Sequence, residues 1–144
     1  MSPSEVDALL AEGVVVRIRP DAKAARSGLV AARAHLMGAA AIAELDPVGA
    51  FSLAYDAMRK ALVAHMRVNG LRVRGGMGAH YNTGRYGLAA LSGRGIDSAL
   101  RDFDTLRLLR NRSEYRDAFV KEADVHEAIS RAQAVLDVVT EDVA

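Results

Sequence analysis

The sequence predicts an all-α fold, an antiparallel up-and-down bundle of four to five main helices in a chain of 144 residues. Three observations support this prediction. Apolar residues recur at spacings of three and four over most of the chain, which is the period of one helix face. Strand-like runs are nearly absent, and no repeat period appears. Helices with one apolar face bury it most economically against one another, so a bundle is expected.

The first 19 residues are predicted to form a short helix and a connector, ahead of a bundle over residues 20–144. Ser2, Pro3 and Glu5 suit the start of a helix that runs to about Ala11, because they offer a cap, a first-turn proline and a capping acid. The valines at positions 14–16 have strand propensity but no evident pairing partner. We therefore interpret residues 12–19 as a connector.

Two long helices are predicted next. The first begins at Pro20 and Asp21 and extends to Leu45, and it is rich in alanine. Its apolar face contains Leu29, Ala32, Leu36, Ala40 and Ala43. The second begins at Asp46 and Pro47 and ends near residues 69–70. Its apolar stripe contains Phe51, Tyr55, Met58, Leu62 and His65 or Met66, and a histidine on such a stripe is expected to be a core residue with satisfied hydrogen bonds.

Residues 70–95 are rich in glycine and are predicted to begin as a loop, with only a short helix from about Tyr86 to Leu91. Another helix follows, capped by Asp97, and a last helix begins near Glu122. Leu100, Phe103, Leu106 and Arg110 share one face of the former, and Val125, Ile129, Ala132, Leu136 and Val139 share one face of the latter. Arg110 thus occupies a position where the pattern expects an apolar residue.

Composition excludes several classes of site. The chain has no cysteine, which excludes disulfides, thiolate metal sites and cysteine nucleophiles. The four histidines show no zinc or di-iron spacing, so we expect neither a metal nor another cofactor. No apolar run is long enough to cross a membrane, and the N-terminus lacks the pattern of a signal peptide, so a cytoplasmic location is expected.

Charge is distributed unevenly, although the formal net charge is only +1. Residues 59–116 contain 12 basic and 4 acidic side chains, a balance of 12 − 4 = +8, while both ends of the chain are acidic. If the arginines converge on one surface, that surface favours a phosphate-bearing partner. The alternative is that the acidic ends fold against the basic middle and neutralise it.

The segment from Leu106 to Arg116 gathers the residues with the most chemical potential. Arg110, Asn111, Arg112 and Tyr115 lie close together near a predicted helix end. Arginine binds phosphate bidentately and stabilises charge that develops on it, asparagine orients an arginine or a ribose hydroxyl, and tyrosine stacks, donates a proton or accepts a covalent group. The structural alternative is an Arg110 to Glu114 salt bridge on an exposed helix face.

These residues resemble the hallmark of the HEPN family (higher eukaryotes and prokaryotes nucleotide-binding), an arginine with a polar neighbour and a histidine four to six positions later. Arg110 and Asn111 match, while Tyr115 stands where the histidine belongs. The resemblance extends from about Pro20 to Val139. It implies a helical bundle that dimerises with two motifs facing each other, and metal-independent RNA cleavage by toxins or phage-defence proteins of bacteria, some paired with a minimal nucleotidyltransferase.

The tyrosine changes the expected chemistry. Its reference pKa is about 10, against about 6.5 for histidine, so it exchanges protons poorly near neutral pH. We therefore expect a protein that binds RNA or a nucleotide with weak or no catalysis. The candidate binding residues are Arg72, Arg74, Arg107, Arg110, Asn111 and Arg112. Alternatives are a metal-independent endoribonuclease toxin in which Tyr115 or His80 replaces the histidine, and a partner of a minimal nucleotidyltransferase with Tyr115 as acceptor.

Overall fold

The computed structural model describes residues 3–115 and 120–144, with side chains from residue 5 to 112 and from 120 onward. Within these ranges the elements are α1 (Pro3–Glu12), β1 (Val15–Arg17), α2 (Ala22–Ile42), α3 (Pro47–Val68), β2 (Leu71–Val73), α4 (Ala79–Leu91), α5 (Asp97–Arg101), α6 (Phe103–Tyr115) and α7 (Glu122–Val143). None of the described helices combines the length and apolar character that a membrane crossing requires. The predicted all-α class is confirmed, with one small sheet added.

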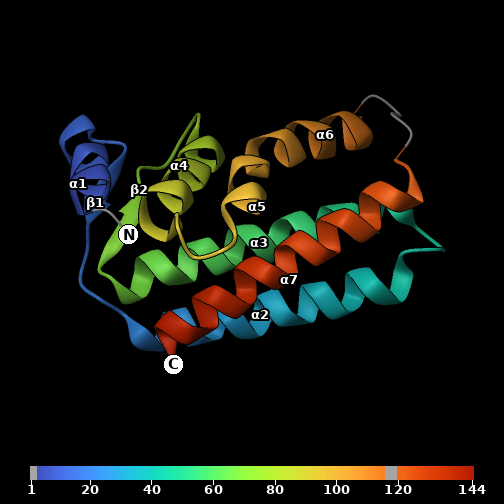
Figure 1. The fold of residues 1–144 in the computed structure, drawn as a ribbon, viewed down its shortest axis with the longest axis horizontal. Coiled ribbons are helices and arrows are strands. Elements are labelled where there is room, and N and C mark those ends of the chain that lie inside the picture. The colour runs from blue at the N-terminus through green and yellow to red at the C-terminus, as the bar shows by residue number, and fades with distance from the viewer. Residues whose placement is uncertain (1–2, 116–119) are drawn as a thin grey trace.

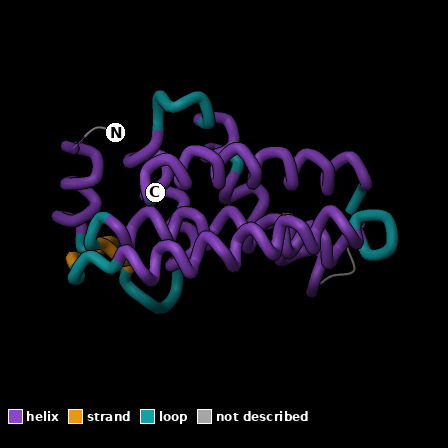
Figure 2. The backbone as a smooth tube through the Cα atoms, turned by 90° about the horizontal axis from the view of Figure 1, so that it is seen from below, coloured by secondary structure: helices purple, strands orange, loops and turns teal. Residues whose placement is uncertain are grey.

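Four main helices, α2, α3, α6 and α7, alternate in direction along the length of the molecule (Figure 1). Helix α3 lies at the centre, with α2 and α7 packed along one side of it and α4 and α6 on another. Helix α1 and the sheet close one end of the bundle (Figures 1 and 2). The predicted up-and-down bundle is therefore present, and its central helix carries residues toward both layers.

The starts of α2 and α3 are each fixed by an aspartate N-cap. Asp21 Oδ1 accepts a hydrogen bond from Ala24 N at 2.9 Å, and Asp46 Oδ1 accepts one from Gly49 N at 2.9 Å. Each carboxylate satisfies an amide that the helix itself leaves unpaired. Pro47 occupies the first turn of α3, where no backbone donor is needed.

The core follows the predicted stripe of α3. The largest buried side chains of α3 are Phe51, Tyr55, Met58 and Leu62, each at most 1% exposed. Alanines and leucines of α2 cover this stripe and allow the two helices to approach closely. One expected core position is wrong, because Ala40 is exposed and Ala39 is buried in its place.

The interpretation of residues 12–19 as a connector without a strand is wrong. Val15, Val16 and Arg17 form β1, which pairs antiparallel with Val73, Arg72 and Leu71 of β2. The turn before β2 requires Gly70, because its φ is +71°. A Cβ at this position would also lie only 2.9 Å from both Ile18 O and Pro20 Cγ. The partner strand lies in a segment predicted to be a loop, so local pattern did not reveal the pairing.

The helix expected from about Tyr86 to Leu91 is present and ends at Leu91, but it is longer than expected, because α4 begins at Ala79. Two glycines of this segment serve helix packing instead of turns. A Cβ at Gly84 would lie 2.7 Å from Phe103 Cδ1, and one at Gly87 would lie 3.1 Å from Leu62 Cδ2. Their lack of a side chain lets α4 lie directly on α3 and the start of α6.

The single helix expected from Asp97 through Arg110 is divided into α5 and α6 at Asp102. Ile96, not Asp97, is the N-cap of α5, and Asp97 Oδ1 instead accepts a hydrogen bond from Gly93 N at 2.8 Å. The same carboxylate therefore holds the preceding turn and not the helix end. The cap predicted at Ser2 lies outside the described residues.

Candidate functional site

Arg110 lies half-buried on the side of α6 that faces α3. Its Nε donates a hydrogen bond to Ser52 Oγ at 3.3 Å. Its guanidinium carbon lies 5.5 Å from the centre of the Tyr55 ring, within the range of a cation–π interaction. Because Ser52 and Tyr55 are three residues apart on α3, one helix face contacts the arginine at two points.

The Tyr55 ring connects Arg110 to His80 in the first turn of α4. Tyr55 Oη lies 3.1 Å from His80 Nδ1, a hydrogen-bond distance, and the two ring centroids are 6.0 Å apart. Tyr55 also stacks on Phe103 at a centroid distance of 5.1 Å. The fold thus brings His80 into the same side-chain group as Arg110, a proximity that the sequence left open.

Arg59 and Arg107 add positive charge beside Tyr55 and His80. Arg59 lies one turn after Tyr55 on α3, and Arg107 lies one turn before Arg110 on α6. Both side chains are half-buried. We refer to the group contributed by α3, α4 and α6 as the Arg110 cluster, which consists of Ser52, Tyr55, Arg59, His80, Arg107 and Arg110.

The two added arginines each have an acidic neighbour on their own helix. Arg107 Nε donates a hydrogen bond to Asp104 Oδ1 at 2.7 Å, whereas Arg59 Nε lies 3.7 Å from Asp56 Oδ1, beyond ordinary hydrogen-bond length. Arg59 Nε is buried and has no hydrogen-bond partner among the described residues. Arg59, Arg107 and Arg110 thus bring three arginines together around Tyr55 and His80.

Burial and these charges set the protonation of the two central rings. Burial lowers the pKa of His80 below its usual value, and the charges of Arg59 and Arg110 lower this pKa further. Burial raises the pKa of Tyr55 to about 12, although the arginine charges act in the opposite direction. At neutral pH the histidine is therefore uncharged and the tyrosine keeps its proton.

The first turn of α4 adds backbone donors beside the cluster. The residue before the helix is Gly78, with φ +87°, and no side chain caps the exposed end. Helix N-termini carry partial positive charge and unpaired amides, which favour anions. His80 belongs to this turn, so the positive end of α4 and the arginines of α3 and α6 act on the same region.

The remaining residues predicted for the site are not part of the Arg110 cluster. On α6, Asn111 is half-buried and Arg112 is exposed. Tyr115 is the last residue of α6, and its side chain lies outside the described set. Arg72 and Arg74 are exposed on and just after β2, and Figure 1 shows α4 between that strand and α6.

Part of the positive charge of residues 59–116 is neutralised by the acidic ends of the chain, which is one of the two alternatives considered from the sequence. Arg85 pairs with Glu12 of α1 at 2.6 Å, and Arg94 pairs with Asp142 of α7 at 2.9 Å. These arginines hold the ends of the chain on the bundle. In the Arg110 cluster, by contrast, arginines of α3 and α6 converge.

His65 forms a separate buried network in the last turn of α3. Its Nδ1 lies 2.7 Å from Tyr86 Oη, and its Nε2 lies 2.8 Å from Asp142 Oδ2. Both ring nitrogens therefore have partners, and only 4% of the residue is exposed. The prediction of a satisfied core histidine is confirmed. Burial lowers the pKa of His65, opposed by its bond to Asp142.

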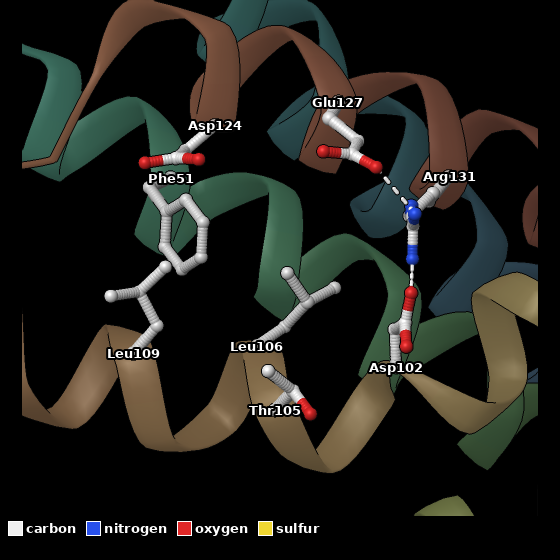
Figure 3. Close-up of a pocket in the computed structure, with 8 residues that line it drawn as sticks. All are labelled: Phe51, Asp102, Thr105, Leu106, Leu109, Asp124, Glu127 and Arg131. Carbon is white, nitrogen blue, oxygen red and sulfur yellow. Dashed lines mark hydrogen bonds and ion pairs between the residues drawn. The ribbon is translucent and has the colours of Figure 1, made fainter.

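A cavity of about 190 Å³ lies between α6 and α7 (Figure 3). Phe51, Leu106 and Leu109 form its apolar wall. Arg131 crosses its rim and pairs with both Asp102 and Glu127. Its one arginine is already paired with two carboxylates, so this cavity is poorly suited to a phosphate. No group of three or more histidine, aspartate or glutamate side chains suited to a metal occurs in residues 3–115 and 120–144.

Sequence reasoning missed three residues of the cluster. Ser52, Tyr55 and Arg59 lie at successive three- and four-residue spacings on α3, which is the spacing of one helix face. Tyr55 was predicted as core, which is correct for its ring, but its hydroxyl reaches a functional candidate. The signal available in the sequence was that these three residues place polar groups along one edge of the apolar stripe of α3.

The model of the HEPN domain family matches residues 46–143, a span that includes all six residues of the Arg110 cluster. No curated protein and no solved structure matches the chain.

Proposed function

Because the chain belongs to the HEPN domain family, we propose that its Arg110 cluster binds the sugar-phosphate backbone of RNA. The observation that carries this proposal is the convergence of Arg59, Arg107 and Arg110 from two helices around one Tyr55–His80 pair. Phosphate contacts by arginine supply most of the affinity of such interfaces.

The geometry of Arg110 supports a role in phosphate recognition. Its guanidinium is held against the Tyr55 ring and Ser52, so little side-chain freedom remains to be lost on binding. A planar guanidinium offers several donors in one fork that matches the oxygens of a phosphate. The amide donors at the start of α4 add a second anion-binding element beside it.

The test is equilibrium binding of labelled single-stranded RNA at several salt concentrations. We expect Arg110→Ala to weaken binding by roughly ten-fold and to lower the salt slope by about one. Arg19→Ala is the matched control, because Arg19 is an equally charged, exposed residue in the connector before α2. Thermal unfolding of both variants verifies that each remains folded. Equal RNA affinity and equal salt slope in the native protein and Arg110→Ala would contradict the proposal.

His80 favours a second candidate function, metal-independent cleavage of RNA. In this reaction the ribose 2′-hydroxyl loses a proton and attacks phosphorus, the bond to the 5′-oxygen breaks, and that oxygen gains a proton. An imidazole that is uncharged at neutral pH is suited to accept the first proton. The Tyr55 hydroxyl can donate to His80 Nδ1 or accept from it, so it holds the ring in either tautomer.

Cleavage is tested with labelled RNA in the presence of a chelator. If His80 is the proton-transfer group, His80→Ala and Arg110→Ala each abolish cleavage, and Tyr115→Ala has a smaller effect. Because the pKa of His80 is lowered, the rate falls only at a pH below the usual histidine value. Binding without cleavage, with cleavage gained in Tyr115→His, would instead identify a binding protein that lacks a working proton-transfer residue.

A further inference from the structure

A small cavity of about 190 Å³ lies between α1, the sheet and α4, beside the end of α3. Figure 1 shows these elements together at one end of the molecule. We name this space the α1 cavity. None of the six residues of the Arg110 cluster lines it, so it is a separate site. We propose that the α1 cavity binds a small zwitterion, a free amino acid with an apolar side chain.

Two opposite charges from different elements line the α1 cavity, Asp7 of α1 and Arg17 of β1. Both residues are exposed, and neither forms an ion pair or a side-chain hydrogen bond with any residue that the structure describes. Arg85 and Arg94, by contrast, each pair with a carboxylate of another helix. An unpaired carboxylate and an unpaired guanidinium beside one cavity match the ammonium and the carboxylate of an amino acid, and both resulting hydrogen bonds are charge-assisted.

Local structure explains why these two charges lie beside an apolar surface. Asp7 shares a face of α1 with Leu10, three residues later. Arg17 shares a face of β1 with Val15, which is only 1% exposed. Both charged residues precede residues 46–143, the span that matches the family model. The charged groups of the α1 cavity are therefore contributed by the segment ahead of the matched domain.

The apolar walls and the size of the α1 cavity define the rest of the ligand. Val6 and Leu10 of α1 and Leu71 of β2 line it. Val6 and Leu71 are buried and Leu10 is half-buried, so an aliphatic side chain placed among them loses contact with water. The volume is below the roughly 300–1,000 Å³ of pockets that hold drug-sized molecules. The cavity therefore suits a molecule with few atoms beyond its two charged groups.

The inner wall of the α1 cavity is already held in place by hydrogen bonds. Asn69 and Tyr86 form this wall. Tyr86 Oη lies 2.7 Å from His65 Nδ1, and Asn69 Nδ2 donates a hydrogen bond to His65 O at 2.8 Å. Because these side chains are fixed before a ligand arrives, binding requires little further ordering of the wall.

The first test is isothermal titration calorimetry of the full chain with L-valine, L-leucine and L-methionine. We expect saturable binding of at least one of them, with a Kd of about 1 mM or below. The deamino and decarboxy analogues of the same amino acids lack the ammonium or the carboxylate. Each analogue should bind at least about ten-fold more weakly than its parent, because one charge-assisted contact is lost. Saturable binding of none of the three amino acids, or equal affinity for an amino acid and both of its analogues, would overturn the proposal.

Two variants locate the binding in the α1 cavity. Asp7→Asn and Arg17→Gln each remove a charge from an exposed residue, so both proteins should fold normally, and each should bind the amino acid at least about ten-fold more weakly. Glu5→Gln and Arg19→Gln are the matched controls, because they remove the same charges from exposed residues of α1 and of the connector before α2. Thermal unfolding verifies that all four variants are folded. Native affinity in both Asp7→Asn and Arg17→Gln would show that the amino acid binds elsewhere and would contradict this site.

Discussion

Arg110 occupies a position that the apolar spacing of its segment assigns to a core residue. The structure shows how a charge is accommodated there. The guanidinium rests over the Tyr55 ring while Nε donates to Ser52. A charged residue at an apolar position is therefore explained by a polar edge on the facing helix.

The protonation of His80 offers a test of this geometry without any ligand. The charge of Arg110 is one cause of the lowered pKa of His80, so Arg110→Ala should raise that pKa toward the usual value. Nuclear magnetic resonance titration of the imidazole signals measures it. Arg112→Ala removes an exposed arginine of the same helix and should not change the pKa of His80. No difference between the native protein and Arg110→Ala would show that the two side chains are farther apart in solution.

At the scale of elements, sequence patterns predicted the long helices well because their signals are local. Aspartate caps and a continuous apolar stripe define α3 from neighbouring residues alone. The errors arose where distant residues decide the outcome. Strand β1 exists because residues 71–73 pair with it, and α4 is long because Gly84 and Gly87 lie against Phe103 and Leu62. The sequence alone does not distinguish a glycine that permits close helix packing from a glycine that permits a turn.

The packing role of Gly84 leads to a stability prediction. In an exposed helix, glycine to alanine is stabilising, because alanine has the higher helix propensity. Here the added Cβ would lie 2.7 Å from the Phe103 ring, and we expect Gly84→Ala to lower the free energy of unfolding by about 1–3 kcal/mol. Chemical denaturation measures the change. A more stable Gly84→Ala protein would mean that α4 does not pack on Phe103 as described.

At the scale of the whole molecule, contacts between distant segments hold the ends of the chain on the bundle. His65 on α3 contacts Tyr86 of α4 and Asp142 of α7, and Arg94 also contacts Asp142. The lowered pKa of His65 means that the unfolded chain binds its proton more readily than the folded chain does. The bond to Arg94 lowers the pKa of Asp142, with the same consequence at more acidic pH.

Stability should therefore fall in acid. The contribution of His65 is unaffected well above a pH of about 6.5, the unfolded value, and stability decreases as the pH falls below it. We expect His65→Gln to lower the unfolding temperature at neutral pH and to reduce its dependence on pH between about 6.5 and 5. His126→Gln, at an exposed position on α7, is the control. An equal loss of pH dependence in both variants would contradict the role assigned to His65.

The side chains of the candidate site were predicted only in part. The sequence indicated Arg110 and the family, but it suggested Tyr115 as the principal partner and could not place His80. The distance from His80 to Tyr55 depends on how α4 packs on α3, and no short motif encodes that packing. Tyr115 and Asn111 remain predictions, as does a nucleotidyltransferase partner.

The four histidines allow RNA binding at the Arg110 cluster to be tested in one titration. His80 lies in the cluster, whereas His35, His65 and His126 lie on α2, in the core and on α7. We would record the imidazole signals by nuclear magnetic resonance while adding a short single-stranded RNA. We expect a saturable shift of the His80 signals that is lost in Arg110→Ala. Saturable shifts confined to His35 or His126, with His80 unchanged, would contradict RNA binding at this cluster.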